Sequence, residues 1–266
     1  MKTSVYDIKG KKVKDIKMPI QFNTPVRKDI IRRAVVAIRK NKVQPYGHRK
    51  LAGRTSSAVF RSTRTGYGHS YNWGIARVPR LMVRGGRRVG RVMNVPHAVG
   101  GPRAHGPKAE KIWKVKMNTK ERRLAIRSAL AATLDKKIVS EHGHKVPEIF
   151  PLIIVEDFEN LSKTKDVIDF LMALGLEAEM ERASKKKVRA GKGTMRGRPY
   201  KKKKGPLFVI SKVSPIIKAA SNIPGIDTVV VSQINTELLA PGAHPGRLVV
   251  YSELALKKME EEKLFF

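Results

Sequence analysis

The chain has 266 residues, with 56 Lys and Arg against 22 Asp and Glu, which gives a formal net charge of +34. Such a charge opposes compaction of the free chain and indicates a polyanionic partner, for which nucleic acid is the first candidate and an acidic membrane surface the second. The absence of cysteine excludes disulfides and thiolate metal sites. No apolar run approaches the roughly 20 residues that a membrane-spanning helix needs.

The first forty residues predict a hairpin followed by an amphipathic helix. Residues 1–7 lack the apolar region of a signal peptide, so we expect a cytoplasmic protein. Residues 5–8 and 13–16 are typical of two short strands that turn at Gly10. Thr24, followed by a proline, predicts the start of a helix, and apolar residues then recur at helical spacing as far as Ile38.

Residues 44–110 form a long basic loop in this interpretation. Glycine and proline interrupt every helical or strand period within it, and Glu110 is the only acid between Asp29 and Glu121. Ordering the backbone costs about 1–2 kcal/mol per residue, and the scattered apolar residues of the loop cannot offset that cost. We therefore expect the loop to take a fixed shape only when it is embedded in folded RNA.

The remaining chain predicts an α/β fold. Asn118 and Glu121 resemble a capping box, and the apolar stripe after them predicts one helix that ends near residue 142. Further strands are expected at 152–155, 207–210, 229–231 and 248–250, with helices at 167–174, after Pro215 and after Ser252. Because continuous apolar runs are typical of strands buried on both faces, we predict a largely parallel sheet with helices on both faces.

A second basic segment, residues 182–205, interrupts this alternation and contains no acid. We interpret it and the loop at 44–110 as two insertions in a single globular α/β domain, residues 1–266. The loop connects two predicted helices that both need the sheet to bury their apolar stripes, so it is not a linker between domains.

Both basic segments carry residue types that bind RNA. Arginine forks bind phosphate and stack on bases, and aromatic side chains offer stacking faces to unpaired bases. The bland alternative is a solvated charge run, but aromatic residues interleave with the cations of the loop. The candidate RNA-binding residues are Arg49, Lys50, Arg54, Arg61, Arg64, Tyr67, Tyr71, Trp73, Arg77, Arg80, Arg84, Arg87, Arg88, Arg91, Arg103, Lys185, Lys186, Lys187, Arg189, Lys192, Arg196, Arg198, Lys201, Lys202, Lys203 and Lys204.

Catalytic and metal-binding motifs are weak by comparison. The Gly-Lys-Gly at 191–193 lacks the spacing of a phosphate-binding loop. His142 and His144 with Glu141 are more typical of a polar helix end than of a metal site, and Glu156 is more typical of a strand-end turn than of a catalytic acid. We expect no enzyme activity, cofactor or metal. The alternative is an RNA-modifying α/β enzyme such as a nucleotide-cofactor methyltransferase, but the glycine-rich turn and following acid that it needs are not visible.

Several motifs resemble one family. Residues 76–80 read Ala-Arg-Val-Pro-Arg, residues 84–90 read Arg-Gly-Gly-Arg-Arg-Val-Gly, and residues 99–105 read Val-Gly-Gly-Pro-Arg-Ala-His. Together with residues 120–130 and 196–207, these stretches resemble the L-four family of large-subunit ribosomal proteins in its archaeal form. The resemblance covers essentially the whole chain.

The resemblance implies a structural constituent of the large ribosomal subunit that binds large-subunit rRNA. Its globular part would sit on the solvent side of the subunit. The loop tip, between about residues 64 and 95, would help to line the constriction of the nascent-peptide exit tunnel, opposite ribosomal protein L-twenty-two. The expected partners are therefore large-subunit rRNA, neighbouring large-subunit proteins and the nascent peptide, with no membrane.

Overall fold

The computed structural model describes residues 2–65, 69–81 and 90–266. Its contacts divide the chain into two compact units: Met1–Asn41 with Lys114–Phe266, which we call the body, and Lys42–Trp113, which we call the loop unit. Four of the predicted RNA-binding residues lie outside the described residues: Tyr67, Arg84, Arg87 and Arg88.

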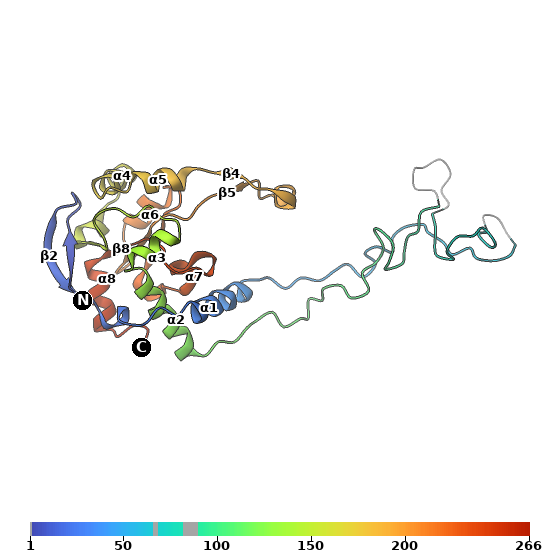
Figure 1. The fold of residues 1–266 in the computed structure, drawn as a ribbon, viewed down its shortest axis with the longest axis horizontal. Coiled ribbons are helices and arrows are strands. Elements are labelled where there is room, and N and C mark those ends of the chain that lie inside the picture. Colours follow the sequence, from blue (N-terminus) through green and yellow to red (C-terminus); the bar gives the residue numbers. More distant parts are fainter. Residues whose placement is uncertain (1, 66–68, 82–89) are drawn as a thin grey trace. The chain divides into compact units, whose positions relative to one another are not determined.

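A six-stranded sheet runs through the described part of the body, with the strand order β2-β1-β3-β8-β6-β7. β2 is antiparallel to β1, and each of the other neighbouring pairs is parallel. The strands are β1 (Lys2–Tyr6), β2 (Lys12–Lys17), β3 (Leu152–Ile154), β6 (Leu207–Ile210), β7 (Asp227–Val230) and β8 (Val249–Ser252). This arrangement confirms the predicted α/β fold (Figure 1).

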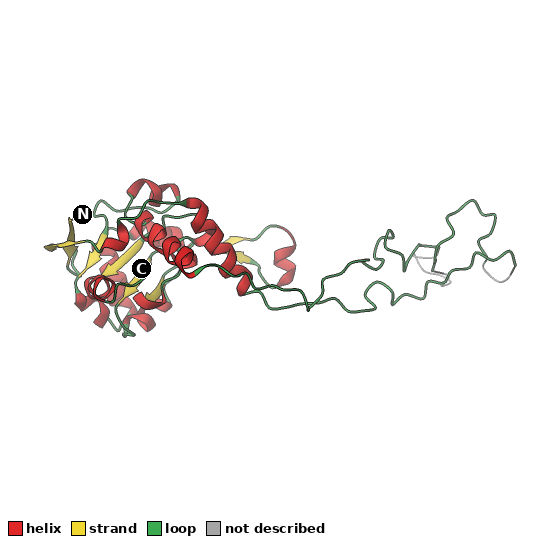
Figure 2. Ribbon diagram, turned by 90° about the horizontal axis from the view of Figure 1, so that it is seen from below, coloured by secondary structure: helices red, strands yellow, loops and turns green. Residues whose placement is uncertain are grey.

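Helices connect these strands and cover both faces of the sheet (Figure 2). They are α1 (Lys28–Asn41), α2 (Thr119–Ala132), α3 (Lys136–Glu141), α4 (Thr164–Ala173), α5 (Glu177–Ser184), α6 (Ile216–Ser221), α7 (Thr236–Leu239) and α8 (Glu253–Glu261). Short 3-10 turns are η1 (Ile20–Phe22), η2 (Glu156–Asn160), η4 (Val231–Gln233) and η5 (Pro241–Ala243). Helices α1, α2, α7 and α8 pack on one face, and α3, α4 and α6 pack on the other.

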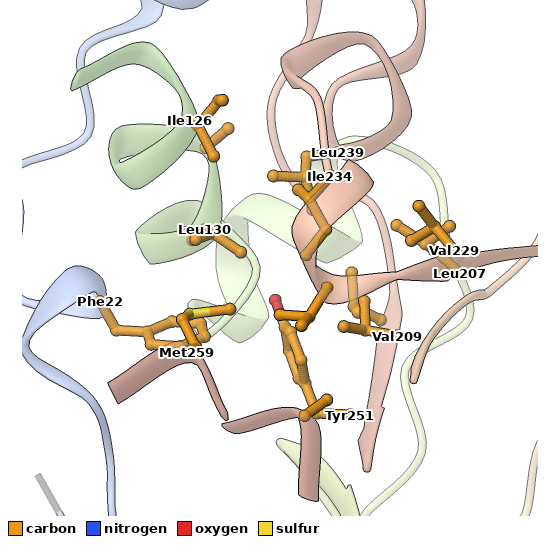
Figure 3. Close-up of a cluster of buried hydrophobic side chains, with 14 of the residues drawn as sticks. Phe22, Ile126, Leu130, Leu207, Val209, Val229, Ile234, Leu239, Tyr251 and Met259 are labelled. Carbon is orange, nitrogen blue, oxygen red and sulfur yellow. The ribbon is translucent and has the colours of Figure 1, made fainter. Parts of the chain in front are cut away.

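The alternation of side chains along β6 explains the continuous apolar runs. Leu207 and Val209 belong to the cluster drawn in Figure 3, whereas Phe208 and Ile210 belong to the cluster on the opposite face. Successive residues of β6 thus point to opposite faces, and all of them are apolar because the strand is buried on both faces. Tyr251 joins the first cluster and keeps its hydroxyl satisfied, because Thr133 Oγ1 lies 2.8 Å from it.

The first predicted helix start is wrong. Helix α1 begins at Lys28 rather than after Thr24. The Thr24 hydroxyl instead donates to the Gln21 carbonyl, at 3.4 Å, and the Pro25 carbonyl accepts a 3.0 Å bond from the Ser128 hydroxyl on α2. The contact between Pro25 and α2 thus fixes the residues just before Lys28 outside α1, although the local capping signals assign them to that helix.

The predicted helix after Asn118 is two helices. The chain breaks between α2 and α3, where the Asp135 side chain accepts a 2.8 Å bond from the Lys137 backbone N–H and caps α3. Asn118 does precede α2, but its side chain makes no capping bond. Glu121 pairs with Arg33 of α1 at 2.9 Å, so the expected capping box is replaced by a contact between helices.

A buried arginine joins three segments of the body. The Arg247 side chain is 1% exposed. Its Nε donates to the Gly205 carbonyl at 3.0 Å and its Nη1 to the Leu238 carbonyl at 3.1 Å. Its Nη2 contacts Asp227 Oδ2 at 2.7 Å, and the same carboxylate receives Lys204 Nζ at 2.9 Å. This network holds the point where the second basic segment enters β6.

We expect Arg247→Met to lower the free energy of unfolding by about 1–3 kcal/mol, because it leaves two carbonyl groups and a half-buried carboxylate, which keeps Lys204, without the guanidinium. Chemical denaturation followed by circular dichroism measures the change. The matched control is Arg198→Met, at an exposed arginine, which should change stability by less than about 0.5 kcal/mol. Equal stability of the two variants would contradict the assigned role of Arg247.

Candidate nucleic-acid interface

The second basic segment folds as a hairpin. Strand β4 (Lys187–Val188) pairs antiparallel with β5 (Tyr200–Lys201), and the 3-10 turn η3 (Gly191–Arg196) lies between them. We call residues 185–204 the basic hairpin. Every residue in it is exposed except Arg189 and Gly193, which are half-buried. The hairpin is thus a surface element with almost no interior.

The cations of the basic hairpin are mostly unpaired. Lys185 pairs with Glu181 at 2.6 Å, and Lys204 pairs with Asp227. Lys186 Nζ lies 4.8 Å from the centre of the Tyr200 ring. The other predicted RNA-binding side chains, apart from Arg189, have no ion partner in the part of the chain that the structure describes: Lys187, Lys192, Arg196, Arg198, Lys201, Lys202 and Lys203.

Arg189 differs from these cations because its guanidinium turns back onto the hairpin. Its Nε donates to the Arg198 carbonyl at 3.1 Å, and its Nη2 donates to the Tyr200 carbonyl at 3.4 Å. Its own carbonyl accepts a 2.7 Å bond from the Thr194 hydroxyl. Arg189 therefore braces the turn, and its contact with RNA stays a prediction.

A buried ionic cluster ties the base of the hairpin to the body. Glu179 on α5 is fully buried. Its Oε1 lies 2.7 Å from His144 Nδ1, and its Oε2 accepts bonds from Arg182 Nε at 2.7 Å and from the Lys145 backbone N–H at 2.9 Å. Arg182 also donates to the Lys204 carbonyl at 2.6 Å. One side chain thus links α5 to the last residue of the hairpin.

The same cluster decides the role of the two histidines. His144 faces Glu179, and His142 stacks on His144 with ring centres 5.2 Å apart. His142 is the C-terminal cap of α3, as the polar-cap interpretation predicts. Among the described residues there is no group of three His, Cys, Asp or Glu that could hold a metal ion.

The loop unit is built without regular elements. Across residues 42–65, 69–81 and 90–113, the structure has no helix or strand and only isolated bridges, from Val59 to Arg80 and from Arg80 to Val92. This confirms, for the described residues, the prediction that the stretch forms no regular helix or strand. None of these described residues belongs to a buried apolar cluster.

Contacts between its two ends hold part of the loop unit together. The Tyr46 and Trp113 rings have centres 4.9 Å apart, and Lys111 Nζ lies 5.1 Å from the Trp113 ring centre. Nearby, the His48 backbone N–H donates to the Pro107 carbonyl at 3.1 Å. In the sequence these two aromatic residues are far apart, and nothing in their spacing indicates that they pair.

Close backbone packing explains one glycine motif of the loop unit. A Cβ built on Gly101 would lie 1.9 Å from the Val95 carbonyl oxygen, so no larger residue fits there. A Cβ on Gly53, which has a φ of +79°, would lie 2.6 Å from the Gly101 carbonyl carbon. These glycines let separate turns of the loop unit touch each other.

The predicted stacking residues of the loop unit have different surroundings. The Tyr71 ring already faces two guanidinium groups, with Arg64 Cζ at 5.5 Å and Arg77 Cζ at 5.0 Å from its centre. Trp73 is 58% exposed, and its ring centre is 6.1 Å from that of His69. Trp73 thus keeps a free aromatic surface, whereas Tyr71 serves first to gather two arginines.

Arg80 has a bracing role like that of Arg189. It is half-buried, and its Nη1 and Nη2 donate to the carbonyls of Gly90 at 2.9 Å and Ala76 at 3.0 Å. Arg61 is also half-buried and has interactions of its own. The other described cations of the predicted set in this unit are exposed: Arg49, Lys50, Arg54, Arg64, Arg77, Arg91 and Arg103.

The buried cluster makes the stability of the body depend on pH. Burial alone would raise the pKa of Glu179, but the bonds from Arg182, His144 and Lys145 outweigh it and lower the pKa from 4.5 to about 2. A lowered carboxyl pKa contributes stability above the unfolded-state value, and this stability is lost as the pH falls towards 2.

We therefore expect Glu179→Gln to remove about 3 kcal/mol of stability at pH 7 and to flatten the acid limb of the stability curve. Denaturant titrations between pH 7 and pH 2 give that curve. Glu177→Gln, at an exposed acid on the same helix, is the control and should keep the wild-type curve. The interpretation fails if both variants lose stability in parallel with the wild type on acidification.

Comparison with known proteins identifies the family. A model of the ribosomal protein L4/L1 family matches residues 16–262. A Nanoarchaeum equitans protein is 46% identical over the full length of both chains. An Archaeoglobus fulgidus protein is 43% identical over 98% of this chain and 99% of its own, and a Methanopyrus kandleri protein is 43% identical over 98% of each. All three are named large ribosomal subunit protein uL4.

The surface chemistry and these comparisons agree. The resemblance found in the loop motifs is confirmed, including its archaeal character. No helix of the described residues is long and apolar enough to span a bilayer. The chain belongs to the ribosomal protein L4/L1 family, and its role is that of a structural ribosomal protein rather than an enzyme.

Proposed function

We propose that this protein is a structural component of the large ribosomal subunit in the cytoplasm, and that it binds large-subunit rRNA through both the basic hairpin and the loop unit. The observation that carries the proposal is the set of exposed, unpaired Lys and Arg side chains on the hairpin. Such side chains bind phosphate groups and release counterions from them.

The positions of the acids support this proposal. Glu159 is buried and accepts bonds from the Ser211 backbone N–H at 2.8 Å and the Ser211 hydroxyl at 2.7 Å. Glu253 is buried and pairs with Lys14 and Lys257, both at 2.8 Å. These two acids thus act in internal contacts, and the acids that reach the basic hairpin, Glu181 and Asp227, are each paired with one of its lysines. An anionic ligand meets little repulsion there.

The loop unit supplies the second contact. Trp73 offers an exposed ring to an unpaired base, and stacking of this kind is worth about 1–3 kcal/mol per base. Arg64 and Arg77, gathered by Tyr71, offer two forks to phosphate. The finer part of the proposal is that residues 64–95 help to line the nascent-peptide exit tunnel opposite ribosomal protein L-twenty-two, with the nascent peptide passing beside them.

The unpaired cations of the hairpin turn should set the salt dependence of binding. For the double variant Lys192→Ala with Arg196→Ala, we expect weaker binding to a large-subunit rRNA fragment. The slope of log K against log salt should be shallower by about 0.7–0.9 for each phosphate that the variant no longer neutralises. Filter binding between about 50 and 300 mM salt measures the slope.

The matched control is Lys165→Ala, at an exposed lysine of α4 outside both basic segments. It should leave the slope near the wild-type value. If the hairpin variant and the control have the same slope, the basic hairpin does not bind rRNA.

Deletion of residues 67–91 tests the tunnel part of the proposal. The body should stay folded and should still bind rRNA, because its core clusters and the basic hairpin lie outside the deletion. Late subunit assembly or the shape of the tunnel should change, which sucrose-gradient profiles and a map of the assembled subunit report. Unfolding of the body would show instead that these residues belong to its core.

A further inference from the structure

The basic hairpin exposes apolar side chains as well as cations. Met195 is 88% exposed, Val188 is 74% exposed and Tyr200 is 51% exposed. Val188 and Tyr200 are cross-strand partners in the hairpin. Met195 has no such cross-strand partner in the hairpin. A single exposed apolar residue is common on protein surfaces, and Met195 is distinguished from such residues by how its turn is built.

The turn η3 is built from the inside by Arg189. The Arg189 side chain crosses to the carbonyls of Arg198 and Tyr200, and a Cβ built on Gly193 would lie 2.5 Å from Arg189 Cδ. The turn ends at Gly197, whose φ of +73° favours glycine. The inner side of the turn is thus filled by an arginine, and the methionine is left on the outside.

Spacing within the turn places Met195 next to a cation. In a 3-10 helix, side chains three residues apart lie on the same side. Lys192 and Met195 therefore share a side of η3 (Gly191–Arg196), and Arg196 follows directly. Figure 1 shows strands β4 and β5 leading from the body to this turn. The result is one apolar side chain set among unpaired cations.

We propose that Met195 is an apolar wedge that contacts the face of an unstacked base in rRNA, while Lys192 and Arg196 contact the flanking phosphates. This inference rests on the proposed rRNA-binding function and adds a residue and a kind of RNA feature to it. Regular duplex exposes no base face, so the expected target is a bulge, loop or single-stranded junction. A flexible, polarizable thioether fits an irregular surface of this kind.

Charge favours RNA over a protein groove as the occupant. A protein that covered Met195 would also cover Lys192 and Arg196, and it would have to supply acids to both. RNA supplies phosphates on each side of every base. The chain itself contributes no acid between Arg182 and Lys204, so the anionic groups come from the partner.

The test compares Met195→Ala with the wild-type full chain on a large-subunit rRNA fragment. We expect affinity to fall about tenfold at every salt concentration. The slope against salt should be unchanged, because an apolar contact releases no counterions. Met195→Leu should restore most of the affinity. Val213→Ala is the control, since Val213 is 80% exposed on the body outside the hairpin, and it should bind as the wild type does.

Arg189 enters the test as a positioning residue. Arg189→Lys keeps the charge but loses the two-carbonyl fork, so we expect weaker binding with an unchanged salt slope. In the Met195→Ala background the same change should have little further effect, because the wedge that it positions is already absent. Full additivity of the two substitutions would overturn the assigned link between Arg189 and Met195.

The outcomes separate this inference from the proposed function. Suppose that Met195→Ala binds like the wild type, while Lys192→Ala with Arg196→Ala still flattens the slope of log K against log salt. The inference about Met195 is then wrong, and the proposed rRNA binding stands. If the wild type itself fails to bind the rRNA, the proposed function fails. A photo-reactive residue placed at position 195 should cross-link to a nucleotide in assembled subunits, and cross-linking to a protein would overturn the inference.

Discussion

Arginine side chains bonded to backbone carbonyls fix the local shape of the backbone at three places in this structure. The chain has 56 Lys and Arg side chains and 22 Asp and Glu side chains, so most of the cations have no carboxylate of their own. Carbonyl oxygens serve as acceptors for some of these cations instead. Arg247 bonds to the carbonyls of Gly205 and Leu238 inside the body, Arg189 bonds across the hairpin, and Arg80 does so in the loop unit. Each of these side chains fixes the backbone around it. Neighbouring exposed cations have no such role and can bind an external anion.

Three of the 22 acids have a complementary role. Glu159, Glu179 and Glu253 are buried and act as acceptors within the body. An acid that is used this way stabilises the fold without neutralising the outer surface. The same chain can therefore keep a folded core and a strongly positive exterior. A strongly positive exterior of this kind attracts polyanions.

Sequence patterns predict the elements that are set by burial. They do not predict helix boundaries that depend on distant contacts, or which way a charged side chain points. The strand at Leu207–Ile210 is recognisable because burial on both faces requires apolar residues at every position. The break at Asp135 and the late start of α1 depend on contacts with distant segments, so local capping rules miss them. Arg189 and Lys192 are equivalent by residue type, yet Arg189 is half-buried against backbone carbonyls and Lys192 is exposed. The residue type gives the charge of a side chain, but only the folded structure shows whether that side chain points to the backbone or to solvent.

The two basic segments differ in how far contacts within the protein order them. The hairpin is anchored at its base by Arg182 and Arg247, which are held by buried carboxylate and carbonyl groups. In the proposed complex, its contacts with rRNA would need little further ordering, so they would contribute directly to affinity and register. The described residues of the loop unit belong to no buried apolar cluster and rely on polar and ring contacts, with which water competes. Phosphates that pair with its exposed arginines, and bases that stack on Trp73, would supply the missing interior. The hairpin would therefore position the protein on rRNA first, and the rRNA would then complete the loop unit.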